Sequence, residues 1–176
     1  MDSNPNRAIS TPMIWFHWLS GMGMILVLVS GLIMDDGPSN LLFNAHVSFG
    51  ILVLAVSIPR LVARLMVGMP QPVAQRGKLE DMAAKIVLYS LLALTVLLPL
   101  SGIALTLGEG DGLSLFGLPL ILPGNEIEWL EKLGEGIHEF AGETLLPLLL
   151  LLHVSASLLH HFVKRDGILL RMLGRT

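Results

Sequence analysis

Apolar stretches alternate with polar breaks along the whole chain. Four stretches, near 12–34, 41–65, 82–107 and 137–163, are long enough to cross a bilayer, which takes about 20 mostly apolar residues. The breaks at 35–38 and 68–72 contain glycine and proline, and a longer connection covers 108–136. No segment shows the period of two that a membrane β-barrel requires. The pattern predicts an all-α membrane protein, a four-transmembrane-helix bundle that forms a single domain over 1–176.

The composition agrees with this pattern and excludes several classes of protein. Hydrophobic residues make up 53% of the 176 residues and charged residues 14%, and the mean hydropathy is +0.72, which excludes an ordinary soluble domain. A net charge of −3 provides no basic field, so no nucleic acid is expected as a partner. The absence of cysteine excludes disulfides, thiolate zinc sites and iron–sulfur clusters. The six histidines are therefore the main candidates for metal ligands.

The charged residues are distributed unequally between the two sides of the predicted spans. Ten of the eleven basic residues fall on one side: Arg7, Arg60, Arg64, Arg76, Lys78, Lys85, Lys164, Arg165, Arg171 and Arg175. Only Lys132 falls on the other side, where ten of the fourteen carboxylates gather. Because basic residues mark the cytoplasmic side, the sequence predicts a multi-pass protein with both termini in the cytoplasm. Arg60 and Arg64 are expected to extend their side chains to the cytoplasmic interface.

The first apolar stretch has one alternative interpretation, a cleaved signal peptide. Arg7 alone is a weak basic region for such a peptide, and no small-residue cleavage pattern follows the stretch. A membrane span is therefore the favoured interpretation.

Four of the six histidines lie at two depths within the predicted spans. His17 lies near the inner end of the first span and His46 near the outer end of the second. His138 and His153 share the fourth span and are 15 residues apart, which is roughly 22 Å of helical rise. A histidine inside a membrane is costly and usually has a partner in the bundle interior. The positions predict two stacked bis-histidine sites, His46 with His138 outside and His17 with His153 inside.

Each of these histidines is followed four positions later by a small residue. These residues are Gly21, Gly50, Gly142 and Ser157. Residues i and i+4 share one helix face, and a haem held edge-on between helices needs that position to be free of a large side chain. The pattern favours two haem groups, each ligated by one histidine pair. The alternative is that the small residues only allow close helix packing in lipid.

Other metals and ligands fit the pattern less well. Tetrahedral zinc needs ligands that converge on one point, whereas the two histidine pairs lie at different depths. Methionine can ligate a haem iron, but the nine methionines are better interpreted as packing residues. His160 and His161 lie at the inner end of the fourth span. For these two residues a quinone site that includes Trp18 competes with a simple interfacial position.

Several short motifs follow one another in an order and spacing that is specific when they are taken together. They are IWFHW at 14–18, AHVSFG at 45–50, FGLP at 116–119, IHE at 137–139, LHVSASLLHHF at 152–162 and KRDGILLRM at 164–172. With these motifs, nearly the whole chain resembles the bacterial di-haem cytochrome b561 family. The resemblance implies a four-helix bundle in the bacterial inner membrane that holds two haem b groups and exchanges electrons with ubiquinone. One activity in that family is superoxide oxidation, with periplasmic superoxide as donor and quinone as acceptor.

One spacing departs from the family pattern. The two ligands of the last helix are one residue closer together in the family than His138 and His153 are here, and Pro147 lies between them. A bulge near Pro147 would take up the additional residue. Without a bulge, His153 would be turned by about 100° from the family position.

The outer redox partner depends on charge. Two imidazole ligands on each iron leave no open coordination position, so the sites suit electron transfer. An outer face with ten carboxylates and one lysine repels the superoxide anion and attracts a basic protein. The sequence therefore favours a cytochrome that carries electrons between ubiquinone and a periplasmic donor or acceptor, such as a basic redox protein. A superoxide oxidase is the alternative, and a haem-free membrane scaffold or transporter is less favoured.

Overall fold

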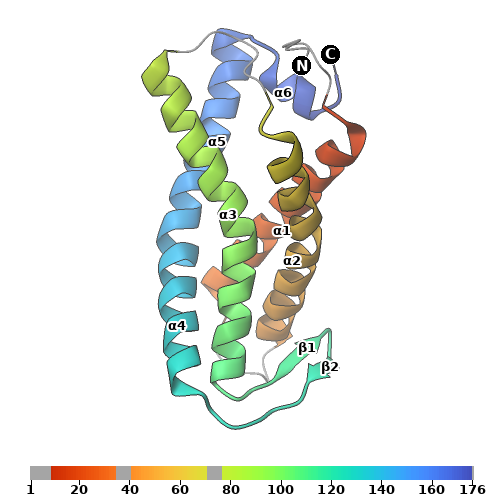
Figure 1. Ribbon diagram of the computed structural model, residues 1–176, viewed down its shortest axis with the longest axis vertical. Coiled ribbons are helices and arrows are strands. Elements are labelled where there is room, and N and C mark those ends of the chain that lie inside the picture. The colour runs from red at the N-terminus through yellow and green to blue at the C-terminus, as the bar shows by residue number, and fades with distance from the viewer. Residues whose placement is uncertain (1–8, 35–40, 71–76, 176) are drawn as a thin grey trace.

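The computed structural model describes residues 9–34, 41–70 and 77–175. Its long helices run side by side along the long axis of the molecule (Figure 1). They are α1 (Thr11–Ile33), α2 (Leu41–Val67), α3 (Lys78–Gly108) and a fourth stretch, Glu128–Lys164, that contains several helical segments. All four are long and apolar enough to cross a membrane. The predicted four-helix membrane bundle is confirmed.

The two ends of the bundle carry different elements (Figure 1). One end holds the start of α1, the end of the fourth stretch and the short helix α6 (Ile168–Met172). We call it the terminal end. The opposite end carries a two-stranded sheet, β1 (Leu113–Leu115) and β2 (Leu118–Ile121), and we call it the hairpin end.

The helix ends agree with the predicted breaks where the structure describes them. α1 has Pro12 in its first turn and ends at Ile33. α2 continues through Pro59 and ends at Val67, and Gly68 follows with a φ of 83°, which glycine adopts without strain. Several residues on which the breaks and the charge distribution depend lie outside the described residues: Arg7, Asp35, Asp36, Gln71, Pro72 and Arg76.

Two of the observed helices begin earlier than the predicted spans. α3 begins at Lys78 rather than at 82, and the fourth stretch begins at Glu128 rather than at 137. The start of the fourth stretch is too acidic for a hydropathy signal, but it packs closely on α3. A Cβ on Gly134 would lie 2.4 Å from the Leu105 nitrogen, and a Cβ on Gly108 would lie only 2.2 Å from a backbone nitrogen of the fourth stretch. Glycine at both contacts lets the two backbones approach closely, and this packing stabilises the start of the fourth stretch.

The hairpin is the element that the hydropathy pattern does not predict. β1 and β2 pair antiparallel around a two-residue turn made by Phe116 and Gly117. Both turn residues have positive φ, 49° and 82°, as a type I′ turn requires. The Phe116 N–H donates to Ser48 Oγ over 2.7 Å, and its ring lies edge-on to Phe49 with centroids 5.4 Å apart. These contacts fasten the hairpin to the first turns of α2.

The fourth stretch contains two π-helical segments. Its parts are, in order, α4 (Glu128–Glu139), η1 (Phe140–Leu145), α5 (Leu146–Leu159) and η2 (His160–Lys164). A π-helical turn accommodates an additional residue within a helix. Because η1 lies between His138 and His153 and ends directly before the turn that contains Pro147, the bulge that the spacing requires is present.

Apolar side chains at mid-height form the core of the bundle. They are Met24, Val53, Leu94, Leu98, Ala141, Leu146 and Leu149. Along the fourth stretch, the last three of these residues lie between His138 and His153, and on α1 Met24 lies two turns after His17. The core therefore separates two levels of histidine.

Candidate functional site

Four half-buried histidines of the spans form two pairs, one toward each end of the bundle. His17 of α1 and His153 of α5 have ring centroids 6.2 Å apart, with the ring planes at 67°. His46 of α2 and His138 of α4 have centroids 5.9 Å apart, with the planes at 84°. We call the first pair the terminal pair and the second the hairpin pair. The structure brings together the partners that the sequence predicts, and their role as ligands stays a prediction.

His46, in the hairpin pair, is held by three residues of α1: Val27, Ser30 and Gly31. Its Nδ1 lies 3.0 Å from the Val27 carbonyl oxygen and 3.2 Å from Ser30 Oγ. A Cβ added to Gly31 would lie 3.0 Å from His46 Cε1. The imidazole therefore packs directly on the glycine backbone while its Nδ1 faces the carbonyl.

His138 is held in the same way by α3. Its Nδ1 lies 3.0 Å from the Leu98 carbonyl oxygen and 3.1 Å from Ser101 Oγ. A Cβ added to Gly102 would lie 2.9 Å from His138 Cε1. Each set consists of a carbonyl, a serine three residues later and a glycine four residues later, and we call it a Ser–Gly clamp.

The clamps determine which nitrogen of each imidazole ring carries the hydrogen. A carbonyl oxygen can only accept, so Nδ1 of His46 and of His138 carries the hydrogen and donates it, and Nε2 keeps a free lone pair. Metal-ligating histidines are commonly held in this form. Two imidazoles that bind one metal from opposite sides, with bonds of about 2.0 Å, have ring centres roughly 6 Å apart. Rings in simple T-shaped contact have a similar separation, so the free Nε2 atoms are the stronger indication of a metal site.

The terminal pair has different surroundings. The Arg60 guanidinium donates to His17 Nδ1 over 3.1 Å and to Ser20 Oγ over 2.8 Å. The prediction that Arg60 extends to the interface is wrong, because its side chain turns inward to these two acceptors. Arg64, one turn later, donates to the Gly68 carbonyl over 3.4 Å. In the described part of the chain, His153 has no hydrogen bond that restrains its ring.

The positions four residues after the histidines differ in the space around them. A Cβ added to Gly21 or Gly50 would meet nothing within 4 Å. Gly23 is instead a packing residue, since its Cβ would lie 2.7 Å from an α2 side chain. A Cβ added to Gly142 would be in ordinary contact with an α3 side chain 3.8 Å away. Ser157 is half-buried. Open space therefore adjoins the predicted haem positions on α1 and α2.

A buried hydroxyl group near the terminal pair lacks a partner. Ser57 is fully buried, and its Oγ has no hydrogen-bond partner within the described residues. It lies three residues before Arg60 on the same face of α2. Buried polar atoms are almost always hydrogen-bonded, so this hydroxyl indicates that a further polar group belongs in this part of the bundle.

Comparison with known proteins places these features in a family. Residues 8–175 match the family model for prokaryotic cytochrome b561. The chain belongs to this family. It is 29% identical over 177 residues to cytochrome b561 homolog 1 of Escherichia coli (strain K12), a match that covers 94% of this chain and 97% of that protein. It is 26% identical over 169 residues to cytochrome b561 homolog 2 of the same strain, which covers 92% of this chain and 88% of that protein.

Family membership confirms the resemblance found in the sequence. This cytochrome b561 is an electron-transfer protein of the inner membrane, and its family binds b-type haem. The hairpin pair fits such a group directly, through its two free Nε2 atoms. At the terminal pair, a His17 ring that would bind iron through Nε2 would carry its hydrogen on Nδ1. Arg60 would then lose its hydrogen bond to Nδ1, because that nitrogen could no longer accept one. Within the described residues, no three histidine or carboxylate side chains gather as a zinc site would need.

The three residues predicted for a quinone site lie at the terminal end, and each makes a different kind of contact. The Trp18 indole N–H donates to the Met172 carbonyl of α6 over 2.8 Å. His160 is buried, and its Nδ1 is hydrogen-bonded to the Asp166 carboxylate. His161 is half-buried, with its ring edge-on to Phe162 at 4.8 Å between centroids. Trp18 and His160 thus anchor the C-terminal segment, whereas no hydrogen bond within the described residues holds His161.

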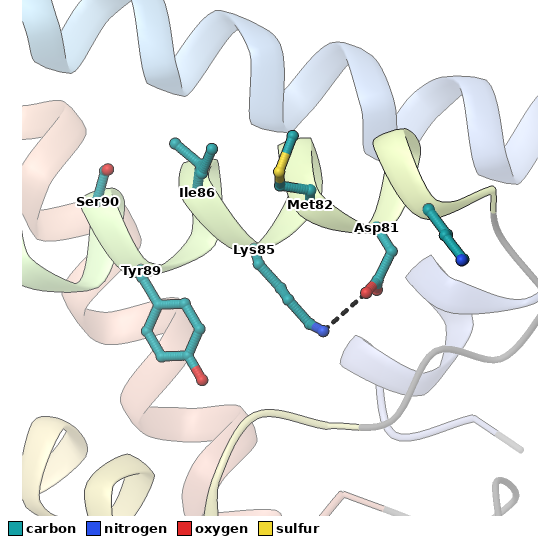
Figure 2. A pocket seen from close by; sticks show the side chains of 7 residues that line it. Asp81, Met82, Lys85, Ile86, Tyr89 and Ser90 are labelled. Carbon is teal, nitrogen blue, oxygen red and sulfur yellow. Dashed lines mark ion pairs between the residues drawn. The ribbon is translucent and has the colours of Figure 1, made fainter.

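A separate cavity of about 450 Å³ lies along the first half of α3 (Figure 2). It is lined by Lys78, Asp81, Met82, Lys85, Ile86, Tyr89 and Ser90. Figure 2 shows the Lys85 ammonium paired with the Asp81 carboxylate, with 2.7 Å between nitrogen and oxygen. None of the residues predicted for a quinone site lines this cavity.

Sequence reasoning missed the groups that hold the histidines. Ser30 and Ser101 are ordinary small residues in an apolar helix, and nothing local distinguishes them. The repeated signal is the Ser–Gly pair, which occurs at 20–21, 30–31 and 101–102. Only the last two, near the hairpin-end termini of α1 and α3, form clamps. This repeat becomes informative only when each pair is placed opposite a histidine of the neighbouring helix.

Proposed function

We propose that this cytochrome b561 holds two haem b groups and carries electrons across the inner membrane between ubiquinone and a periplasmic redox partner. His17 and His153 ligate one iron, and His46 and His138 ligate the other. The observation that carries the proposal is the presence of two histidine pairs toward opposite ends of the bundle, with ring centroids 6.2 and 5.9 Å apart. The small residues proposed to flank the two groups are Gly21, Gly50, Gly142 and Ser157.

The residues around the pairs favour electron transfer over oxygen chemistry. A haem iron with two imidazole ligands has no free coordination position and exchanges single electrons. The Ser–Gly clamps keep His46 and His138 in the ligating tautomer, so both axial positions are supplied by the chain. The apolar core excludes water between the two levels.

The terminal end is the proposed cytoplasmic end. Besides Arg60 and Arg64, six described basic residues lie at this end: Lys78, Lys85, Lys164, Arg165, Arg171 and Arg175. The hairpin end has Lys132, which pairs with Glu128 over 2.5 Å. Positive residues mark the cytoplasmic side, so both termini are assigned to the cytoplasm and the hairpin to the periplasm.

Ubiquinone is proposed to dock at the terminal end, next to the His17–His153 pair. Trp18 and His160 are each held in place there by a hydrogen bond to the C-terminal segment. His161, which no hydrogen bond within the described residues holds, is the ring available to a quinone carbonyl. These three side chains remain the proposed quinone site.

The periplasmic partner is proposed to be a basic redox protein. Seven described carboxylates lie at the hairpin end: Glu109, Asp111, Glu126, Glu128, Glu131, Glu135 and Glu139. The single lysine there is already paired with one of them. Such a face accelerates encounter with a cation and slows encounter with an anion. A superoxide oxidase activity is the alternative that the family resemblance supports.

Rapid mixing of the purified holoprotein separates these possibilities. The protein is reduced with a short-chain ubiquinol and mixed with a basic c-type cytochrome at low salt and at about 1 M salt, where the screening length is about 3 Å. The proposal predicts fast oxidation that slows strongly with salt. Reduction by superoxide faster than its spontaneous dismutation would instead favour the oxidase, and a colourless preparation would favour a scaffold or transporter.

A further inference from the structure

The two histidine pairs differ in the charge next to them. At the terminal pair, Arg60 places a guanidinium 3.1 Å from His17 Nδ1 and 2.8 Å from Ser20 Oγ. Ser20 is fully buried. No carboxylate among the described residues forms an ion pair with Arg60. The terminal pair therefore has a positive charge beside it that no described carboxylate neutralises.

The hairpin pair has partial negative charges beside its Nδ1 atoms, where His17 has the Arg60 guanidinium. The Val27 and Leu98 carbonyl oxygens each lie 3.0 Å from a histidine Nδ1. The residue that follows His138 is the carboxylate Glu139. No lysine or arginine among the described residues is hydrogen-bonded to this pair, whose Nδ1 partners are two carbonyl groups and two serines.

These surroundings act in opposite directions on a redox group. Reduction adds one negative charge to a site, so a nearby cation favours the reduced form, by an energy that falls with distance and local dielectric. A carbonyl that accepts from Nδ1 makes the imidazole a stronger donor to its metal, which favours the oxidised form. We propose that Arg60 makes the terminal pair the more easily reduced site, and that the two Ser–Gly clamps make the hairpin pair the less easily reduced one.

The charge of Arg60 stays at the terminal pair when His17 becomes a ligand. The guanidinium then loses its acceptor on Nδ1, because that nitrogen carries the hydrogen of the ligating ring. Ser20 Oγ remains an acceptor, and Ser57 Oγ on the same face of α2 is a buried acceptor without a partner. The bond to Ser20 Oγ keeps the guanidinium beside the pair, and Ser57 Oγ is the proposed replacement acceptor.

The inference gives the protein a direction. It rests on the proposed function, because it requires one haem at each pair. With the more easily reduced site at the terminal end, electrons accumulate on the side assigned to the cytoplasm and to ubiquinone. Inside the chain, electron transfer from the hairpin pair to the terminal pair is then the favourable step, whichever external partner supplies the electron.

Redox titration of variants with one intact pair tests this inference. His46→Ala leaves the terminal pair and His153→Ala leaves the hairpin pair, and each is titrated as purified holoprotein in lipid nanodiscs. We expect the terminal pair to have the higher midpoint potential. In the His46→Ala background, Arg60→Gln should lower the midpoint potential of the terminal pair by at least about 59 mV. For one electron, this shift is a tenfold change in the reduction equilibrium constant.

Three further variants keep the test specific. Arg60→Lys retains the charge and should shift the potential less than Arg60→Gln. If Arg60→Gln does not fold, the comparison of the two intact pairs still tests the inference. Arg64→Gln removes the same charge one turn further away and should also shift it less. In the His153→Ala background, Ser101→Ala should raise the potential of the hairpin pair.

The outcomes separate this inference from the proposed function. Equal potentials at the two pairs, a lower potential at the terminal pair, or equal effects of Arg60→Gln and Arg64→Gln would overturn the inference while leaving a di-haem protein. Loss of all haem from His46→Ala or His153→Ala, or no loss from either, would overturn the assignment of one haem to each pair.

Discussion

Replacing Gly102 by alanine tests whether the Ser–Gly clamps matter for haem binding. The added Cβ would lie 2.9 Å from His138 Cε1 and 3.2 Å from His138 Nδ1. Carbon atoms in favourable contact are about 3.5–4.0 Å apart, so the ring must retreat from α3 by about 0.6 Å or more. The backbone of α3 cannot give way easily, because Leu98 of the same turn belongs to the buried core.

The size of the effect follows from the hydrogen bond that the retreat would break. His138 Nδ1 lies 3.0 Å from the Leu98 carbonyl oxygen, and a displacement of that size lengthens the distance to as much as about 3.6 Å, beyond hydrogen-bond range. A hydrogen bond of this kind contributes about 0.5–1.5 kcal/mol, which corresponds to about twofold to tenfold in affinity. Loss of an outer-shell partner of a metal ligand costs roughly 10- to 100-fold. We therefore expect haem affinity at the hairpin pair to fall by about twofold to 100-fold.

The assay is a haem titration of the apoprotein, followed by the Soret band, in a His153→Ala background that leaves only the hairpin pair. Gly136→Ala is the matched control, because Gly136 lies on the same helix as His138 and a Cβ there meets nothing within 4 Å. It should bind haem as tightly as the background chain. Equal affinities for the Gly102→Ala and Gly136→Ala proteins would refute the role of the clamp.

Three other substitutions test separate parts of the account. Gly50→Leu should fold, because nothing lies within 4 Å of a Cβ at that position, yet it should lose about one haem per chain. The control Gly136→Leu should keep both haems. Retention of both haems in Gly50→Leu would show that the open space is not a haem position. Ser48→Ala leaves the hairpin N–H that it accepts over 2.7 Å without a partner, at a cost of about 1–3 kcal/mol, so amide exchange in the hairpin should accelerate while exchange in the core stays unchanged. Trp18→Phe removes the 2.8 Å bond to α6 and should make the C-terminal segment more sensitive to protease, and an unchanged cleavage rate would argue against that anchor.

The helices and the histidine pairs could be predicted because their signals are local. Hydropathy finds stretches such as Leu41–Val67 directly, and a histidine in an apolar helix is conspicuous. The spacing of His138 and His153 also predicted a bulge near Pro147, and the π-helical segment Phe140–Leu145 confirms it.

The remaining features depend on contacts between segments far apart in the chain. Arg60 has the sequence pattern of an interfacial arginine, and only the position of α1 beside α2 brings Ser20 and His17 within reach of it. The acidic first turns of α4 are helical because Gly108 and Gly134 let two backbones approach. The hairpin is short, and Ser48, a buried residue of another element, is what holds it.

Haem stoichiometry is the most direct test of the central claim, that each histidine pair holds one haem b. Purified protein in mild detergent is measured by the pyridine haemochrome assay and by reduced-minus-oxidised spectra, for the wild type, His46→Ala, His153→Ala and the control His161→Ala. The account predicts two b haems per chain in the wild type and the control, and about one in each of the other two variants. A wild type without haem, or unchanged haem content in His46→Ala and His153→Ala, would contradict it and leave the histidines as packing residues.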